Sequence, residues 1–345
     1  MFNHDLYMQR CLHLAVLGQP WVAPNPMVGA IIVYNDKIIG EGFHQKFGGA
    51  HAEVNAINSV SDKSLLKKST IYVSLEPCTH YGKTPPCTNL IIENKIPRVV
   101  VACLDPNPLV AGKGINLLKN AGIEVEVGVL EHEAKYLNKR FNCYFEKKRP
   151  FITLKWAASS DNFCGIINTS KKITNWFSDV KVHQLRSTEQ AILIGFNTAK
   201  IDNPKLNTRN WFGKNPIKIV IDLQGELSSE LHIFNGGSQT LVFSETPNNN
   251  SEFINYILID KHNELLHQIM SNLYERNIQS VLIEGGPKTQ QLFIDSNLWD
   301  EAHIFTSSDK LGEGIIAPII SNYDEFFNQK LLNDSYSIFT PKNQI

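Results

Sequence analysis

One histidine, two cysteines and a glutamate in the first part of the chain could together perform metal-dependent chemistry: His51, Glu53, Cys78 and Cys87. An imidazole and two thiolates suit a zinc ion, and catalytic zinc sites use three protein ligands so that water takes the fourth position. Zinc lowers the pKa of such a water towards neutrality, and Glu53 is then available to carry protons. The residues therefore predict a catalytic zinc site with Glu53 as its acid and base.

The order of these residues matches that of zinc deaminases, in which His-x-Glu is followed by Pro-Cys-x-x-Cys. Here eight residues, 79–86, separate Cys78 from Cys87, so the loop between the cysteines is much longer. A proline directly before Cys87 is favourable at the start of a helix, and a helix N-terminus favours the thiolate form. The alternative is a structural zinc site, for which His44 and His80 are the candidate fourth ligands.

The elements that must hold these residues follow from the spacing of apolar residues and from turn-forming residues. Two strands joined by Asn35-Asp36 are expected to form a hairpin, and both His51 and Cys87 are expected at the starts of helices. This alternation of strands and helices predicts a sheet covered by helices. We expect strands at 28–34, 37–44, 70–75, 98–103 and 123–127, and helices at 5–17, 51–57, 87–94, 114–120 and 131–148.

A basic cluster that ends in Arg149-Pro150 follows the last of these helices and marks a boundary. We therefore expect two domains, 1–148 and 149–345. The second part again alternates strands with helices, which predicts a separate α/β domain. Its strands are expected at 151–157, 191–194, 217–221, 240–243, 256–259, 280–283 and 303–306, and its helices at 176–186, 264–276 and 289–296.

The composition excludes several classes of protein. The chain has 345 residues, enough for two domain cores, and its formal net charge of −1 gives no overall attraction for nucleic acid or for a membrane surface. No run approaches the roughly 18 apolar residues of a membrane-spanning helix, and residues 1–19 lack the apolar core of a signal peptide. Six cysteines do not make a disulfide framework in so long a chain, and a thiolate metal site suits a reducing compartment. We expect a cytoplasmic protein with no nucleic-acid or membrane partner.

Four segments together closely resemble one enzyme family, the bifunctional riboflavin-biosynthesis deaminase–reductases: residues 25–29, 51–53, 76–87 and 105–108. The resemblance covers nearly the whole chain, and the long third segment makes it far more specific than the zinc ligands alone. It implies an α/β protein with an N-terminal three-layer domain like that of cytidine deaminases and a C-terminal domain like dihydrofolate reductase. It also implies Zn²⁺ and NADPH as cofactors, a small phosphoribosylated pyrimidine as substrate, and a homodimer or larger homo-oligomer.

By this resemblance, the first domain hydrolytically removes an amino group from a diaminopyrimidinone that carries a phosphoribosylamino group. Zinc on His51, Cys78 and Cys87 would activate the water, and Glu53 would carry protons to the ring nitrogen and then to the leaving amine. The family's longer loop between the cysteines holds the phosphoribosyl group. The residues that the resemblance assigns to the substrate are Asn25 and His44 on the pyrimidine, Thr79, His80 and Lys83 in the loop, and Asp105 and Asn107 on the ribose phosphate.

The second domain would then reduce the ribosyl group to a ribityl chain with NADPH. Its clearest local feature is a strand that runs into Glu284-Gly285-Gly286-Pro287 and a helix, because backbone N–H groups at such a junction can bind phosphate. The family assigns five residues to the substrate, with Lys155 as a proton donor or a substrate contact: Lys155, Arg186, Leu206, Arg209 and Glu284. It assigns to the cofactor Ala157, Lys172, Thr198, Asp202, Gly286, Pro287, Lys288, Thr289, Gln290, Gln291 and Leu292.

Two positions of the second domain depart from the family's pattern. Asn162 stands where many relatives have glycine, which is a mild change because asparagine tolerates a positive φ. Lys172 stands where relatives have a tryptophan against the cofactor. The alternative interpretation is therefore a deaminase whose second domain no longer reduces its substrate. A nucleic-acid-directed deaminase is a further alternative, disfavoured by the near-zero charge and by the long loop between the cysteines.

Overall fold

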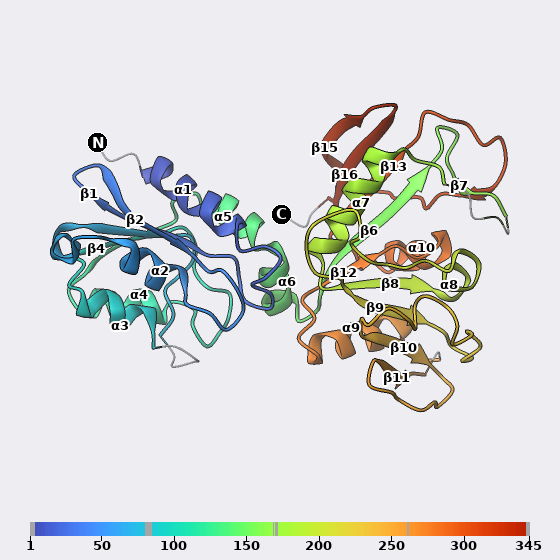
Figure 1. Ribbon diagram of the computed structural model, residues 1–345, viewed down its shortest axis with the longest axis horizontal. Helices are drawn as coiled ribbons and strands as arrows, with labels where there is room; N and C mark the ends of the chain where they lie inside the picture. The colour runs from blue at the N-terminus through green and yellow to red at the C-terminus, as the bar shows by residue number, and fades with distance from the viewer. Residues whose placement is uncertain (1–3, 80–84, 168, 170–171, 261, 343–345) are drawn as a thin grey trace. The chain divides into compact units, whose positions relative to one another are not determined.

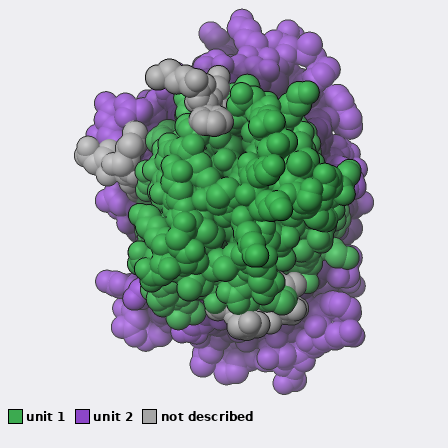
Figure 2. Space-filling model, turned by 90° about the vertical axis from the view of Figure 1, so that its left-hand side faces the viewer, with its two compact units in different colours: residues 1–147 green, residues 148–345 purple. Residues whose placement is uncertain are grey.

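The computed structural model describes residues 4–79, 85–167, 169, 172–260 and 262–342. The chain divides into two compact units, Met1–Lys147 and Lys148–Ile345. Each unit is an α/β structure with its own sheet (Figure 1). Each unit also has its own apolar cores. Figure 2 shows the first unit in green and the second in purple. Within the part of the chain that is described, no helix is long and apolar enough to cross a membrane.

The first unit is built on a five-stranded sheet whose strands lie in the order β2-β1-β3-β4-β5. β2, β1 and β3 are antiparallel neighbours, whereas β3, β4 and β5 are parallel. The strands are β1 (Gly29–Tyr34), β2 (Lys37–Phe43), β3 (Thr70–Val73), β4 (Arg98–Val101) and β5 (Glu124–Val127). The helices are α1 (His4–Val16), α2 (Ala52–Ser59), α3 (Cys87–Glu93), α4 (Lys113–Asn120), α5 (Glu131–Leu137) and α6 (Lys139–Lys147), with a short 3-10 helix, η1 (Lys63–Lys68).

Side chains alternate along the central strand and supply a core on each face of this sheet. Ala30 and Ile32 of β1 pack with residues of α2, α3 and α4, whereas Ile31 and Val33 pack with residues of α1 and α5. Successive side chains of a strand point to opposite faces, so a strand covered on both sides is apolar throughout, as β1 is. Helix, sheet and helix form three layers, as the family resemblance implied.

α2 lies close to β2 because Gly42 has no side chain. A Cβ atom on Gly42 would lie 2.3 Å from the backbone nitrogen of Ala56 and 2.6 Å from the carbonyl oxygen of Ala52. No larger residue fits there without moving the helix. The contact fixes the first turn of α2, and with it His51 and Glu53, against the sheet.

The charged segment predicted as a single helix over 131–148 is two helices, so that prediction was wrong. α5 ends at Leu137, and α6 begins at Lys139. The intervening Asn138 is buried; its side chain accepts a hydrogen bond from the N–H of Met27 and donates one to the carbonyl oxygen of Met27, both at 2.8 Å. The Asn138 side chain thus pairs with both the N–H and the carbonyl oxygen of Met27. The backbone of Asn138 departs from helical geometry, which separates α5 from α6.

The second unit contains a nine-stranded sheet in the order β11-β10-β9-β8-β12-β6-β13-β16-β15. The strands from β11 to β13 in this order are parallel neighbours, and β16 and β15 run antiparallel. The strands are β6 (Phe151–Ala158), β8 (Ala191–Gly195), β9 (Ile217–Ile221), β10 (Thr240–Ser244), β11 (Ile254–Leu258), β12 (Ser280–Ile283), β13 (Glu301–Thr306), β15 (Tyr323–Leu331) and β16 (Asp334–Pro341). A separate pair consists of β7 (Phe163–Gly165) and β14 (Ile315–Ile316).

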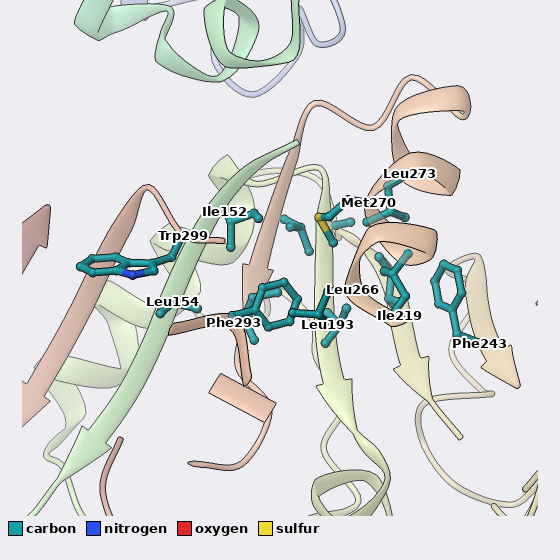
Figure 3. Close-up of a cluster of buried hydrophobic side chains, with 14 of the residues drawn as sticks. Ile152, Leu154, Leu193, Ile219, Phe243, Leu266, Met270, Leu273, Phe293 and Trp299 are labelled. Carbon is teal, nitrogen blue, oxygen red and sulfur yellow. The ribbon is translucent and has the colours of Figure 1, made fainter. Parts of the chain in front are cut away.

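Helices cover both faces of this sheet as well. α9 (Leu265–Glu275) and α10 (Pro287–Asp295) pack in one core, where Leu266 and Phe293 lie near Leu193 and Ile219 of the central strands (Figure 3). α7 (Trp176–Thr188) and α8 (Phe196–Asp202) contribute to the core of the other face. α8 begins directly after β8, and α10 begins shortly after β12. These helix starts thus lie at the carboxyl ends of parallel strands, where α/β proteins bind ligands.

The predicted strands and helices of this unit are present, with ends within two residues of those expected. Neither α8 nor the C-terminal hairpin of β15 and β16 was predicted from the sequence. β15 is exposed over nearly its whole length, so it has no apolar alternation that would mark it as a strand. Its pairing with β16 defines it instead.

Candidate active sites

His51, Cys78 and Cys87 come together around the starts of two helices. His51 directly precedes α2 with extended backbone angles, Cys87 is the first residue of α3, and Cys78 lies in the segment after β3. The Nδ1 atom of His51 lies 3.5 Å from Cys78 Sγ and 3.3 Å from Cys87 Sγ. Nitrogen and sulfur ligands of a tetrahedral zinc, at about 2.0 Å and about 2.3 Å from the metal, are about 3.5 Å apart. The three side chains already have the spacing of zinc ligands.

Among the described residues, this group of possible metal ligands has three members and no fourth. His44, one candidate for a fourth ligand, uses both ring nitrogens elsewhere: Nδ1 lies 3.0 Å from the carbonyl oxygen of Ala50, and Nε2 lies 3.1 Å from Asn25 Nδ2. His80, the other candidate, lies outside the described residues. Three ligands with one open position are the arrangement of a catalytic zinc site.

Hydrogen bonds hold the thiols of Cys78 and Cys87 in place and shift their pKa values in opposite directions. The Cys87 N–H donates to Cys78 Sγ at 3.4 Å, and Thr88 donates to the carbonyl oxygen of Cys78 from its N–H (3.2 Å) and its hydroxyl (3.1 Å). The hydrogen bond between the two thiols lowers the pKa of Cys78 to about 4 and raises the pKa of Cys87. The pair thus retains one proton, and ligation of zinc by both sulfurs requires its loss.

Glu53 lies in the first turn of α2 and is only 4% exposed. Burial, and then the negative charge of Cys78, raises the pKa of Glu53 to about 7, and the Cys87 thiol shares a hydrogen bond with the carboxylate. Two residues apart within a helix, His51 and Glu53 would point in different directions. Because His51 precedes the first helical turn, both side chains lie beside the two thiols. A carboxyl group with a pKa near neutrality can accept a proton and release it again.

Asn25 and His44 form a pair beside the metal ligands. The ring of His44 lies edge-to-face with that of His51, with 5.6 Å between the ring centroids. Burial lowers the pKa of His44, so the ring is neutral: Nδ1–H donates to the carbonyl oxygen of Ala50, and Nε2 accepts from the Asn25 amide. The side chain of Asn25 is thereby held in one orientation next to the zinc ligands.

Two further predicted substrate residues of the first unit, Asp105 and Asn107, lie in a turn-rich loop. Asp105 accepts a hydrogen bond from the N–H of Asn107 at 2.8 Å, and Asn107 accepts one from the N–H of Leu109 at 3.0 Å. Both are typical of polar residues that shape a turn. Thr79 is half-buried. Two predicted residues lie outside the described residues: His80 and Lys83.

Three predicted substrate residues of the second unit form a charged cluster. Arg186 of α7 donates two hydrogen bonds to Glu284, from Nε to Oε1 at 2.7 Å and from Nη2 to Oε2 at 2.8 Å. The Nζ atom of Lys155 in β6 lies 3.6 Å from Glu284 Oε2. Burial alone would raise the pKa of Glu284, but the charges of Arg186 and Lys155 hold it at about 2. Two cations around one carboxylate leave the cluster with a net positive charge.

A loop that contains Leu206, Asn207 and Arg209 lies beside this cluster. Arg186 Nη1 donates to the carbonyl oxygen of Asn207 at 3.2 Å, and Arg209 Nη1 donates to Asn207 Oδ1 at 2.9 Å. Leu206 is buried and has a φ of 51°. His183, which the sequence analysis missed, also contacts this loop; burial, Arg186 and Arg209 lower its pKa to about 4. Its spacing from Arg186, three residues along one helix face, was the available signal.

The junction between β12 and α10 approaches the start of α8 closely. The N–H of Gly286 donates to Thr198 Oγ1 at 2.8 Å, and a Cβ atom on Gly195 would lie 2.4 Å from Thr289 Oγ1. A cavity of about 400 Å³ lies beside this contact. It is lined by three predicted cofactor residues, Lys288, Thr289 and Leu292, and by residues that were not predicted, including Phe196, Ile221, Leu223 and Leu265.

The remaining residues of the predicted cofactor helix have different roles in the structure. Pro287 is its first residue, where the missing N–H is no loss. Gln290 is buried and donates to the carbonyl oxygens of Lys155 at 2.9 Å and Gly285 at 2.6 Å. Gln291 donates to the last residue of α10. Gln290 therefore links the helix to the strand that carries Lys155.

Three further predicted cofactor residues lie on other elements. Ala157 is half-buried in β6, and Asp202 is the last residue of α8. Lys172 is exposed and forms an ion pair with Asp179 of α7, with 2.5 Å between Nζ and Oδ2. Asn162 has a φ of 68°, the conformation in which asparagine replaces glycine most readily.

Comparison with known proteins identifies the family. A family model described as the cytidine and deoxycytidylate deaminase zinc-binding region matches residues 1–103, and the RibD C-terminal domain matches residues 150–324. The riboflavin biosynthesis protein RibD of Aquifex aeolicus is 41% identical over 316 residues, which cover 90% of this chain and 88% of that protein. The chain belongs to the RibD family.

Solved structures agree with this identification. A Thermotoga maritima protein described as a diaminohydroxyphosphoribosylaminopyrimidine deaminase/5-amino-6-(5-phosphoribosylamino)uracil reductase matches with a TM-score of 0.91 and 37% identity, over 98% of each chain. RibD of Acinetobacter baumannii matches with a TM-score of 0.90 and 32% identity, over 99% of each chain. The predicted fold class, a cytidine-deaminase-like domain followed by a dihydrofolate-reductase-like domain, is confirmed.

As a member of the RibD family, the chain is an enzyme of riboflavin biosynthesis with a zinc-dependent deaminase half and an NADPH-dependent reductase half. The His51, Cys78 and Cys87 side chains fit zinc by donor type and by spacing. Both family models match, and no finding favours the alternative of a deaminase with a degenerate second domain.

Proposed function

We propose that residues 1–148 deaminate a diaminopyrimidinone bearing a phosphoribosylamino group, with Glu53 as the catalytic residue and zinc held by His51, Cys78 and Cys87. When bound, zinc supplies a water acidic enough to attack the amine-bearing ring carbon near neutral pH. The Glu53 carboxylate takes up a proton from this water and passes it to the ring nitrogen; it then takes up the proton of the hydroxyl added to the ring carbon and delivers it to the amine, which leaves as ammonia. A pKa raised by burial suits this double use.

The substrate is held at two places in this unit. Asn25, oriented by its hydrogen bond to His44, holds the pyrimidine beside the zinc ligands. Asp105 and Asn107 contact the ribose phosphate from their loop. The long segment between the two cysteines completes the phosphoribosyl site with Thr79, His80 and Lys83. The eight residues between the cysteines support this assignment, since a substrate without a phosphoribosyl group would not need them.

We propose that residues 149–345 reduce the deaminated product by opening its ribosyl ring to a ribityl chain. NADPH supplies the hydride. Arg186 and Arg209 bind the substrate phosphate, because guanidinium groups donate paired hydrogen bonds to such oxygens. Lys155 donates a proton or holds the substrate as the ring opens. Glu284 lies near the substrate and keeps both Lys155 and Arg186 in place, and Leu206 contacts the substrate from the loop that carries Arg209.

The cofactor lies along the β12–α10 junction in this proposal. Thr198 fixes the N–H of Gly286, and the first turn of α10 faces the cavity of about 400 Å³. Lys288, Thr289 and Leu292 contact NADPH directly from the lining of that cavity. The other residues assigned to the cofactor are Ala157, Lys172, Asp202, Pro287, Gln290 and Gln291.

The observation that carries the deaminase assignment is the buried Glu53 beside three donors with zinc-ligand spacing. Glu53→Gln tests it, because the amide keeps the shape of the side chain and cannot carry the proton. We expect this variant to retain the zinc content of the unaltered enzyme, to release no ammonia, and to oxidise NADPH normally when given the deaminated intermediate. Ammonia release at the unaltered rate would show that Glu53 is not the proton carrier.

We also propose that the chain forms a homodimer or a larger homo-oligomer. β15 is the last strand of its sheet and is exposed, with Phe326 54% and Phe327 40% exposed. The unpaired N–H and C=O groups of an edge strand can pair with a strand of another chain, and exposed aromatic side chains add apolar surface for such a contact. Sedimentation of the purified protein tests this, and Phe327→Glu is expected to shift the protein towards monomer. A monomer for the unaltered protein at micromolar concentration contradicts the proposal.

We propose the cytoplasm as the location of the enzyme. Two of its zinc ligands are thiols that must stay reduced, and thiol sites persist in reducing compartments. Cell fractionation tests this; recovery of the protein outside the cytoplasmic fraction contradicts it.

A further inference from the structure

A buried carboxylate close to the zinc ligands has no role in the chemistry above. Glu76 is 4% exposed and precedes Cys78 by two residues. Its two oxygens accept hydrogen bonds from four backbone N–H groups of one later segment. These come from Asp105 (3.3 Å) and Gly112 (2.9 Å) to Oε2, and from Gly114 (2.8 Å) and Ile115 (3.2 Å) to Oε1.

These bonds make Glu76 the cap of a helix that has no side-chain cap of its own. The residue before α4 is Gly112, which offers no side chain to the N–H groups of the first turn. Such groups have no partner inside the helix, and a carboxylate is favoured at a helix N-terminus. Because Glu76 also holds the N–H of Asp105, one side chain closes both ends of the loop 105–112.

The backbone beside Glu76 packs against the same helix. A Cβ atom on Gly114 would lie 2.3 Å from the carbonyl oxygen of Pro77, so only glycine permits this approach. The N–H of Glu76 itself donates to the carbonyl oxygen of Cys103 at 3.0 Å. Residues 76–78 therefore connect a zinc ligand to the start of α4 and to the loop that carries Asp105.

We propose that Glu76 is a positioning residue for substrate recognition: it sets the Asp105–Asn107 segment relative to the zinc ligand Cys78. The proposal rests on the function proposed above, in which Asp105 and Asn107 contact the ribose phosphate. With four N–H groups on its oxygens, Glu76 takes no part in proton transfer. Its loss is expected to weaken the hold on the phosphoribosyl group and to leave the zinc ligands in place.

Glu76→Gln is the informative variant, because it keeps the size of the side chain but replaces one accepting oxygen with a donor. We expect KM for the phosphoribosylated substrate to rise roughly ten-fold, as for the loss of about one hydrogen bond to a charged group. For the dephosphorylated riboside, KM and kcat should stay within about two-fold. Zinc content should be unchanged, and the amide hydrogens of Gly112, Gly114 and Ile115 should exchange faster with solvent.

Asp62→Asn provides the matched control. Asp62 also caps a short helix of the same unit, accepting from the N–H of Ser64 at 2.9 Å. Its amide variant should leave both KM values and the exchange of the α4 amides unchanged. An equal loss of activity towards both substrates in Glu76→Gln would overturn the proposal, because it indicates general support of the fold. An unchanged KM for the phosphoribosylated substrate would overturn it too.

A second variant applies if Glu76→Gln does not fold. Gly114→Ala keeps the carboxylate but pushes α4 away from Pro77, and it should raise KM selectively for the phosphoribosylated substrate. Equal effects on the two substrates would again overturn the proposal. The deaminase assignment has a separate outcome: if the unaltered enzyme releases no ammonia from either substrate, the proposed function fails irrespective of Glu76.

Discussion

Replacing Arg186 with methionine leaves a buried carboxylate without its closest partner. The Arg186 side chain is 11% exposed and donates two hydrogen bonds to Glu284 and one to the carbonyl oxygen of Asn207. Removing one member of a buried ion pair costs about 3–5 kcal/mol. Lys155 remains within 3.6 Å of Glu284, so we expect the lower end, about 3 kcal/mol of destabilisation of the second unit.

The same pair predicts how the stability of this unit depends on pH. The pKa of Glu284 is about 2 in the folded chain, compared with 4.5 for an ordinary glutamate. A carboxyl group whose pKa is lowered on folding stabilises the protein above its unfolded pKa, and this contribution is lost as the pH falls towards the folded pKa. The difference corresponds to about 3 kcal/mol. It should be present above pH 4.5, should disappear between about pH 4.5 and 2, and should be largely absent in Arg186→Met.

Urea unfolding followed by tryptophan fluorescence measures this effect. Four of the five tryptophans, Trp156, Trp176, Trp211 and Trp299, belong to the second unit. Arg276→Met is the matched control, since Arg276 is exposed and donates a hydrogen bond to Asn272 of its own helix. This variant should change stability by no more than about 0.5 kcal/mol.

Adding Glu284→Gln to Arg186→Met should restore part of the lost stability, because no uncompensated charge then remains buried. Two results would refute the reasoning about this pair. One is a destabilisation by Arg186→Met of no more than about 0.5 kcal/mol at pH 7, which is the range of ordinary surface substitutions. The other is a double variant no more stable than Arg186→Met alone.

Three further predictions follow from the first unit. Removal of zinc with a chelator should abolish ammonia release but leave intact the oxidation of NADPH with the deaminated intermediate. The two steps are assayed in parallel, and loss of both activities would contradict this prediction. Cys87→Ser should weaken zinc binding at least ten-fold in competition with a metal indicator, since a hydroxyl is a poorer zinc ligand than a thiolate; equal affinity contradicts the ligand assignment. Asn138→Ala should destabilise this unit by about 1–3 kcal/mol because the N–H and carbonyl of Met27 lose their partner, and an unchanged thermal midpoint would argue against it.

The grouping of His51, Cys78 and Cys87 could be predicted from sequence because all three are chemically distinctive residues and two of them stand at helix starts. His51 and Cys87 stand where local signals begin α2 and α3, and those helix starts bring their side chains together. The capping role of Glu76 could not be predicted. Its partners, from Asp105 to Ile115, are backbone N–H groups far along the chain, and no residue type marks them.

The site of the second unit depends more on tertiary contacts. Lys155, Arg186 and Glu284 lie on three separate elements, and only the family resemblance placed them together before the structure did. Apolar residues that line the cofactor cavity, such as Phe196 and Leu265, are of the same residue types as those of the hydrophobic core. The sequence alone therefore does not distinguish cavity-lining residues from core residues. The break at Asn138 was missed for a similar reason, since it depends on Met27 in a distant loop.

The most direct test of two coupled activities in one chain is a single-vessel measurement with the phosphoribosylated diaminopyrimidinone and NADPH. We predict one ammonia released for each NADPH oxidised, with oxidation lagging behind ammonia release. In Glu53→Gln, both should stop with this substrate, and NADPH oxidation should return when the deaminated intermediate is supplied. Ammonia release without any oxidation of NADPH, in the presence of intact zinc, would contradict a functional reductase in the second unit.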